Sequence, residues 1–145
     1  MKSYRTLLVT AVIIMASLMS LSVSAKIKCV PKIYAFGFAA SFNDSIVYFT
    51  DIQEIDSAWV GEKNEFLVNR ENYSYQLKNY LSRIGLEHRT CVISYALTRK
   101  DIEKKYKKMK DKYVKAERFS IKDLDEKDFH FTAIKPDEYQ INNSK

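Results

Sequence analysis

Glycine, proline and cysteine are scarce in this chain, whose 145 residues include three glycines, two prolines and two cysteines. So few glycines argue against a glycine-rich phosphate loop or a collagen-like repeat, and the shortage of both glycine and proline argues against a long flexible linker. Internal repeats and low-complexity tracts are absent too. Because 46% of the residues are hydrophobic and 13% aromatic, the chain has enough apolar material to fold.

The motifs of the common enzyme classes are also missing. The sequence has no Walker loop, dinucleotide fingerprint, HExxH, GxSxG or CxxC motif, and its acidic residues do not follow the spacing of an EF-hand calcium loop. These absences favour a non-catalytic protein only weakly, because many active sites are assembled from dispersed residues. We predict no cofactor and no metal.

The first 25 residues have the three parts of a secretory signal peptide. Lys2 and Arg5 form a basic start, residues 7–21 are mostly apolar, and residues 23–25 are the small residues that a signal peptidase prefers. The apolar run is shorter than the ~20 residues that cross a bilayer comfortably. We therefore predict cleavage, a mature chain that begins near Lys26, and an exported protein that is periplasmic or secreted. An uncleaved anchor helix is the alternative.

The remaining residues suffice for one domain with a hydrophobic core and are too few for two. Pro136 follows the last apolar run and ends it. We assign residues 1–25 to the signal peptide, residues 26–136 to a single domain and residues 137–145 to a flexible polar tail.

Hydrophobic periodicity predicts a domain of the α+β class. Side chains alternate along 32–42, as in a strand, and turn residues at 43–45 join this segment to a second strand in a β-hairpin. Residues 52–69 are irregular. The predicted elements are strands at 32–42, 46–51, 89–97 and 129–134, a further short strand at 119–124, a helix that begins at Asn69 or Asn72 and ends before Gly85, and a helix at 99–115.

The order β-β-α-β-α-β favours a mixed sheet of four or five strands with two helices packed on one face. The strand at 89–97, the helix at 99–115 and a final strand suit a right-handed crossover, which would make the sheet mixed.

Positive charge is concentrated in one segment. The chain carries a net charge of +6, and residues 99–118 hold ten Lys and Arg against four Asp and Glu, while residues 26–98 are balanced. Such a field favours an acidic protein, an anionic glycan or an anionic lipid surface as partner. An exported location argues against nucleic acid.

The predicted helix at 99–115 has two different faces. Lys104, Lys108 and Lys112 are four residues apart and are expected to form an outward ridge that binds the anionic partner. A merely solvated lysine-rich face is the alternative. The inner face is expected to dock on the sheet through Ile102, Tyr106, Met109 and Tyr113.

Trp59 and Phe66, in the irregular segment, form a second candidate binding surface. Exposed aromatic rings can stack on sugars or hold peptides. The alternative is that both rings belong to the core.

Cys29 and Cys91 have two interpretations. In an oxidising compartment they are expected to form one disulfide, which would stabilise the fold by roughly 4 kcal/mol. Alternatively, Cys91 is a small buried hydrophobe and Cys29 a free thiol.

One catalytic set is also available, with Cys91 as nucleophile, His88 or His130 as base and Asp128 as the orienting carboxylate. Ordinary structural roles for these residues are favoured over catalysis, because most buried cysteines are inert.

Three stretches resemble small exported bacterial proteins of uncharacterised function. They are AFGFAASFND at 35–44, YFTDIQ at 48–53 and YSYQL at 73–77. The resemblance covers most of the mature chain and includes no catalytic motif. It implies a location in the bacterial envelope and no activity.

These patterns together predict an exported, non-catalytic binding module of the bacterial cell envelope that contacts its partner through a basic helix. A structural or assembly protein that acts through homo-oligomers is the alternative. A small enzyme that uses Cys91 with His88 or His130 is less favoured.

Overall fold

A long first strand, β1 (Ile27–Ala40), is the centre of the fold. The computed structural model describes residues 25–143, so the predicted signal peptide lies outside the described residues apart from Ala25. The first part of β1 pairs with β3, and its second part pairs with β2 and β4. The other elements are β2 (Ile46–Thr50), β3 (Gln53–Gly61), α2 (Arg70–Arg83), β4 (Thr90–Ala96), α3 (Arg99–Lys115), β5 (Ser120–Leu124) and α4 (Glu138–Asn142).

The five strands form one mixed sheet, which confirms the predicted α+β class. β5 pairs parallel with β2, while β1 pairs antiparallel with β2, β3 and β4. β4 and β5 consequently run in the same direction, and α3 connects them as a crossover. Of the helices within residues 25–143, none is long and apolar enough to span a membrane.

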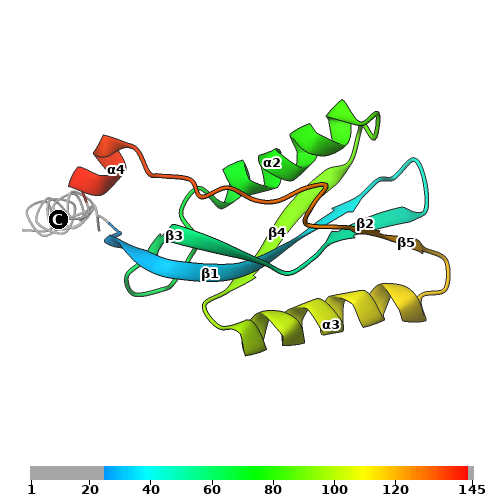
Figure 1. Cartoon of the computed structure of the whole chain (residues 1–145), viewed down its shortest axis with the longest axis horizontal. Coiled ribbons are helices and arrows are strands. Elements are labelled where there is room, and N and C mark those ends of the chain that lie inside the picture. Colours follow the sequence, from blue (N-terminus) through cyan, green and yellow to red (C-terminus); the bar gives the residue numbers. More distant parts are fainter. Residues whose placement is uncertain (1–24, 144–145) are drawn as a thin grey trace, which may run out of the picture.

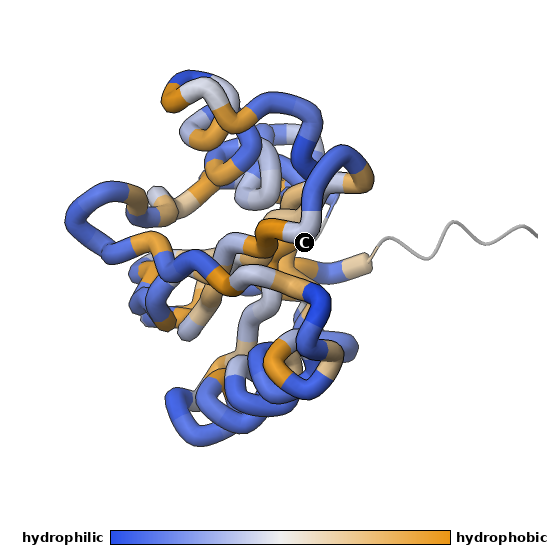
Figure 2. The backbone as a smooth tube through the Cα atoms, turned by 90° about the vertical axis from the view of Figure 1, so that its right-hand side faces the viewer, coloured by the Kyte–Doolittle hydropathy of each residue, from blue (hydrophilic) through white to orange (hydrophobic). Residues whose placement is uncertain are grey.

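The two long helices cover opposite faces of the sheet, so the prediction that both pack on one face is wrong. Figure 1 shows α2 above the sheet and α3 below it, and the view in Figure 2 shows the same three layers. Both faces of β1 are apolar. Ile33 and Ala35 belong to the core beneath α2, whereas Phe36 and Phe38 belong to the core beneath α3. One face of β1 therefore packs against α2, and the opposite face, which carries the aromatic residues, packs against α3.

β3 lies in the segment that was predicted to be irregular. Ser57 has a φ of 56°, and at this point the burial pattern shifts by one residue. Gln53 and Ile55 are buried before it, and Ala58 and Val60 are buried after it. The shift removes the simple alternation by which a strand is recognised in a sequence.

Residues 129–134 do not form a strand, which corrects a further prediction. This C-terminal strap runs past α2 towards α4 (Figure 1), and it buries Phe129 and Phe131 in the core beneath α2. Its backbone groups bond to the side chains of Gln53, Gln76 and Tyr73 instead of a neighbouring strand. Gln53 accepts from the Phe131 N–H and donates to the Phe129 carbonyl, both at 2.8 Å. The real strand near this end of the chain is β5.

The helix boundaries agree with the sequence. α3 has the predicted bounds, and the Thr98 hydroxyl accepts the Asp101 N–H at 3.2 Å as its cap. α2 begins after Asn69, although the Asn69 side chain makes no cap bond, and Gly85 follows the helix with a φ of 85°. Within the predicted polar tail, α4 begins at a capping box formed by Asp137 and Gln140.

Candidate functional site

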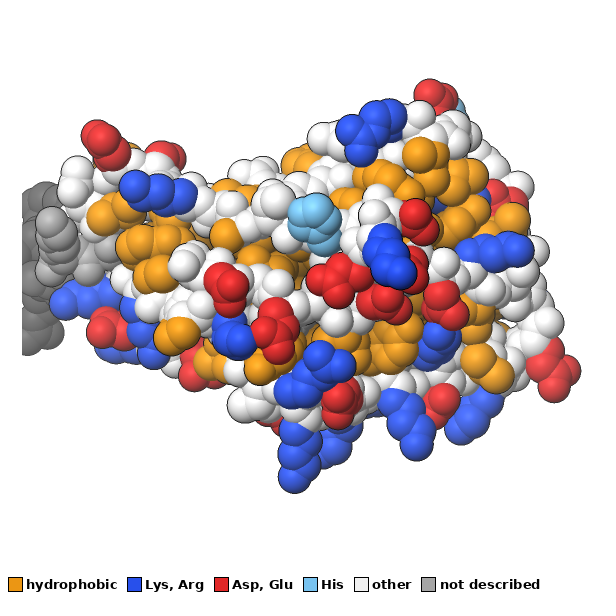
Figure 3. Space-filling view, viewed as in Figure 1, with side chains coloured by type: hydrophobic (Ala, Val, Ile, Leu, Met, Phe, Trp, Pro, Cys, Tyr) orange, Lys and Arg blue, Asp and Glu red, His pale blue; other side chains and the backbone are white. Residues whose placement is uncertain are grey.

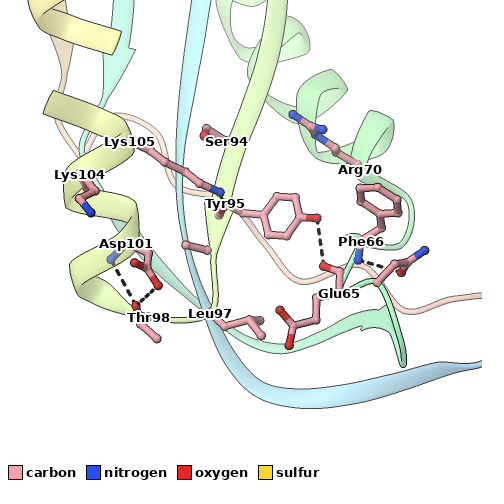
Figure 4. A pocket seen from close by; sticks show the side chains of 12 residues that line it. Glu65, Phe66, Arg70, Ser94, Tyr95, Leu97, Thr98, Asp101, Lys104 and Lys105 are labelled. Carbon is pink, nitrogen blue, oxygen red and sulfur yellow. Dashed lines mark hydrogen bonds between the residues drawn. The ribbon is translucent and has the colours of Figure 1, made fainter. Parts of the chain in front are cut away.

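A groove of about 710 Å³ lies beside β4, between the parts of the chain that carry α2 and α3. We call it the β4 groove. Figure 4 shows α3 on one side of it, the loop before α2 on the other side, and the end of β4 between them. Its lining includes Glu65, Phe66, Arg70, Tyr95, Leu97, Asp101, Lys104 and Lys105.

Tyr95 forms a rigid platform in the β4 groove. Its hydroxyl donates to the Glu65 carbonyl at 3.0 Å and accepts the Leu67 N–H at 2.8 Å. The Arg70 guanidinium and the Lys105 ammonium lie 5.8 and 5.7 Å from the centre of its ring. These contacts are within the range of cation–π attraction, so the ring is held by charges as well as by hydrogen bonds.

Side chains cover the outer edge of β4, whose only strand partner in the described sheet is β1. Arg70 donates to the Ile93 carbonyl at 2.9 Å, and Ser74 accepts the Ile93 N–H at 3.2 Å. Lys105 donates to the Tyr95 carbonyl at 2.7 Å. Because these bonds occupy the outward N–H and carbonyl of Ile93 and the carbonyl of Tyr95, the edge of β4 is hindered from strand pairing beside the groove. The β4 groove is therefore suited to a side chain and not to an added strand.

The structure brings together two of the five predicted binding residues. Phe66 and Lys104 both line the β4 groove. Lys108 and Lys112 lie further along α3, outside the groove lining, and Trp59 is half-buried in β3 opposite Cys29. The aromatic and the basic candidate surfaces thus meet at one place, through one residue from each.

Arg70 and Tyr95 were missed in the sequence. The sequence places Tyr95 only in the predicted strand at 89–97, and Arg70 only near the start of a predicted helix. A tyrosine near the end of a strand and an arginine at the start of a helix are both common, so neither gives a signal alone. Their meeting depends on the packing of α2 against β4.

The lysine ridge is formed as predicted. Lys104, Lys108 and Lys112 are all exposed, and none of them forms an ion pair with another residue in the range 25–143. Lys110 differs, because it pairs with Asp123 at 2.6 Å. The inner face docks as expected: Ile102 is fully buried, while Tyr106, Met109 and Tyr113 pack against the same core.

Cys29 and Cys91 are far apart, so the disulfide prediction is wrong and both are free cysteines. Cys29 lies opposite Trp59, whereas Cys91 lies opposite Ala39. Cys29 and Ala39 are ten residues apart along β1, which corresponds to roughly 30 Å in a strand. A disulfide requires Cα atoms within about 7 Å of each other.

The catalytic set around Cys91 is not assembled. The Cys91 thiol lies 3.9 Å from the Arg89 carbonyl, and the cavity beside it contains neither His88 nor His130. Burial raises the pKa of the Cys91 thiol to about 11, although Lys78 and Arg89 oppose the shift. His88, His130 and Asp128 are exposed. A thiol that stays protonated and lacks a base is a poor nucleophile.

We expect iodoacetamide to label only Cys29 in the native protein at pH 8, and to label both cysteines after denaturation without reductant. With a pKa of about 11, roughly one thousandth of the Cys91 thiol is ionised at pH 8, and the group is also partly buried. Intact-mass measurement of the adducts gives the count, and Cys91→Ala is the control that assigns them. A denatured, unreduced chain without any adduct would show that Cys29 and Cys91 are joined by a disulfide, and would contradict their separation in the fold.

A buried arginine joins the hairpin tip to β4. The Arg89 guanidinium pairs with Asp44 at 2.6 Å, donates to the Ile46 carbonyl at 2.9 Å and lies 4.6 Å from the centre of the Tyr48 ring. Since these contacts use its two terminal nitrogens and one face, Arg89 fixes the turn between β1 and β2. The Nε of Arg89 is also buried, and it has no hydrogen-bond partner within the described residues.

Comparison with protein-family models, with curated proteins and with solved structures finds no match. The resemblance to small exported bacterial proteins therefore stays a prediction. Among residues 25–143, no group of three or more His, Cys, Asp or Glu side chains is placed to hold a metal ion.

Proposed function

We propose that this protein is an exported, non-catalytic binding module of the bacterial cell envelope, which holds an anionic partner through the outer face of α3. The observation that carries the proposal is the unpaired lysine ridge of Lys104, Lys108 and Lys112. The partner classes that suit this field are an acidic protein, an anionic glycan and an anionic lipid surface.

The distribution of charge supports the proposal. Figure 3 shows Lys and Arg side chains gathered along α3 at the lower edge of the molecule, and Asp and Glu side chains gathered in the middle of the same face. The Asp51 carboxylate accepts the Glu126 N–H at 3.2 Å, which brings these two acidic residues together. Only one ion pair, from Lys110 to Asp123, joins α3 to this region within the described residues. The positive field of α3 is therefore not cancelled by the rest of the surface.

Reversing the ridge lysines is expected to weaken binding to poly-L-glutamate at least about tenfold in 0.1 M salt. The reason is that Lys104→Glu, Lys108→Glu and Lys112→Glu replace attraction by repulsion on the same face. Binding by the parent protein should also fall in 1 M salt, where the Debye length shortens from about 10 Å to about 3 Å. Isothermal titration calorimetry measures both effects.

The matched control changes the same net charge elsewhere, through Lys28→Glu, Lys127→Glu and Lys135→Glu, which are all exposed and lie outside α3. Far-UV circular dichroism should be unchanged in both triple variants. Equal losses in the two variants would show a net-charge effect only, and an unchanged affinity in the ridge variant would reduce the basic face to a solvated surface.

A further inference from the structure

We infer that the anionic partner is an extended acidic protein segment, in which one aromatic or large aliphatic side chain enters the β4 groove while neighbouring carboxylates pair with the lysine ridge. This inference rests on the proposed function and adds the chemical class of the partner to it.

Phe66 presents an exposed apolar ring at the β4 groove. Its side chain is 65% exposed at the rim of the β4 groove, although it is large and apolar. Its backbone is fixed, because its N–H donates to the Asn64 side chain at 3.1 Å and its carbonyl accepts the Gly61 N–H at 2.8 Å. An exposed apolar ring on a fixed backbone is pre-organised for contact with an apolar group.

The lining of the β4 groove favours an apolar guest. Its three basic side chains, Arg70, Lys104 and Lys105, face two acidic ones, Glu65 and Asp101. Arg70, Lys105 and Asp101 are already bonded to other groups, the last to the Thr98 hydroxyl at 2.7 Å. Of the three basic side chains, only Lys104 has no such bond within the described residues, and it belongs to the ridge. The remaining basic side chains of the lining therefore offer little to a charged group. An apolar side chain finds instead the rings of Tyr95 and Phe66 together with Leu97 (Figure 4).

The β4 groove is continuous with the lysine ridge. Lys104 lines the groove and is also the first member of the ridge, followed by Lys108 and Lys112 one helical turn apart each. From Lys104 to Lys112 the helix rises about 12 Å, which equals roughly four residues of an extended chain. A segment with one apolar anchor and about four acidic residues beside it therefore matches the combined surface.

A bilayer or a glycan fits this surface less completely. Either could neutralise the exposed lysines, but a flat headgroup layer or a hydrophilic chain presents no single apolar side chain to the β4 groove. A sugar could stack on the exposed ring of Phe66, but the space between Phe66, Tyr95 and Leu97 would stay unfilled.

The test compares two fluorescein-labelled peptides by fluorescence anisotropy, one with a phenylalanine next to four glutamates and one with alanine in place of that phenylalanine. We expect the phenylalanine peptide to bind about tenfold more tightly, which is typical of one well-buried aromatic anchor. Phe66→Ser should reduce its affinity to that of the alanine peptide and leave the alanine peptide unaffected. Tyr139→Ser, at another exposed aromatic that does not line the groove, is the matched control and should change neither.

The outcomes separate the inference from the proposed function. Equal affinities for the two peptides, both lost in the ridge variant, would overturn the inference and leave the proposed function intact. Tighter binding to phosphatidylglycerol vesicles than to either peptide, insensitive to Phe66→Ser, would overturn it in favour of a membrane surface. If the ridge variant binds both peptides like the parent, the proposed function and the inference fail together. Both substituted rings are exposed, so the variants should fold, which circular dichroism verifies.

Discussion

Replacing Gln53 by alanine is expected to lower the free energy of unfolding by about 2–4 kcal/mol. Gln53 is only 2% exposed, and its amide is the partner of two backbone groups of the C-terminal strap, the Phe129 carbonyl and the Phe131 N–H. Alanine would leave both groups buried without a partner, and each unsatisfied group costs about 1–3 kcal/mol. Urea unfolding followed by circular dichroism measures the loss.

Gln76 provides the matched control for this prediction. It binds the same strap in the same way, accepting the Thr132 N–H and donating to the Thr132 carbonyl, both at 2.9 Å. Thr132 is exposed, so water can replace these bonds in Gln76→Ala, and the expected loss is below about 1 kcal/mol. Equal losses of unfolding free energy in the two variants would show that the contribution of Gln53 to stability does not depend on its burial.

The two glutamines explain why the strap could not be predicted. Alternation of Phe129 and Phe131 with polar residues is the pattern of a strand, and both aromatics do point into the core. What the pattern cannot specify is the hydrogen-bond partner. Here that partner is a side chain 76 residues away in the sequence for Phe129, and such a pairing has no local signal in either segment.

Other parts of the fold were predictable because their determinants are local. The cap of α3 needs only Thr98 and Asp101, three residues apart, and its amphipathic face needs only the helical period. The placement of α2 and α3 on opposite faces of the sheet has no local determinant in the sequence. It depends on how β1 shares its two faces between helices that come later in the chain.

In the candidate site too, one part could be predicted from local sequence and the other part could not. The lysine ridge is a property of one helix and was read directly from the spacing of Lys104, Lys108 and Lys112. The β4 groove combines a loop, the start of α2, the end of β4 and the start of α3. Phe66 was identified as an aromatic in an irregular segment, but only the fold places it beside Tyr95 and Lys104 (Figure 4).

Three parts of the molecule approach β1 closely at Gly37. A Cβ atom at this position would lie 2.6 Å from a Leu77 methyl carbon of α2, 3.0 Å from the Phe131 ring of the strap and 3.2 Å from the Thr50 methyl carbon. Leu77 and Phe131 are both buried, so neither can turn into solvent. The Gly37 N–H also donates to the Thr50 hydroxyl at 2.8 Å, which fixes the strand at this position.

Gly37→Ala is therefore expected to destabilise the protein by about 1–3 kcal/mol, the usual cost of an added methyl group in a packed core. A strand normally gains about 0.5–1 kcal/mol when alanine replaces glycine, so a loss would mean that packing outweighs this gain. The double variant Gly37→Ala with Leu77→Ala should lose less than the sum of the single losses, because the shortened Leu77 side chain makes room for the new methyl group. If Gly37→Ala unfolds at the same urea concentration as the parent, α2 and the strap do not close on β1 as tightly as these distances require.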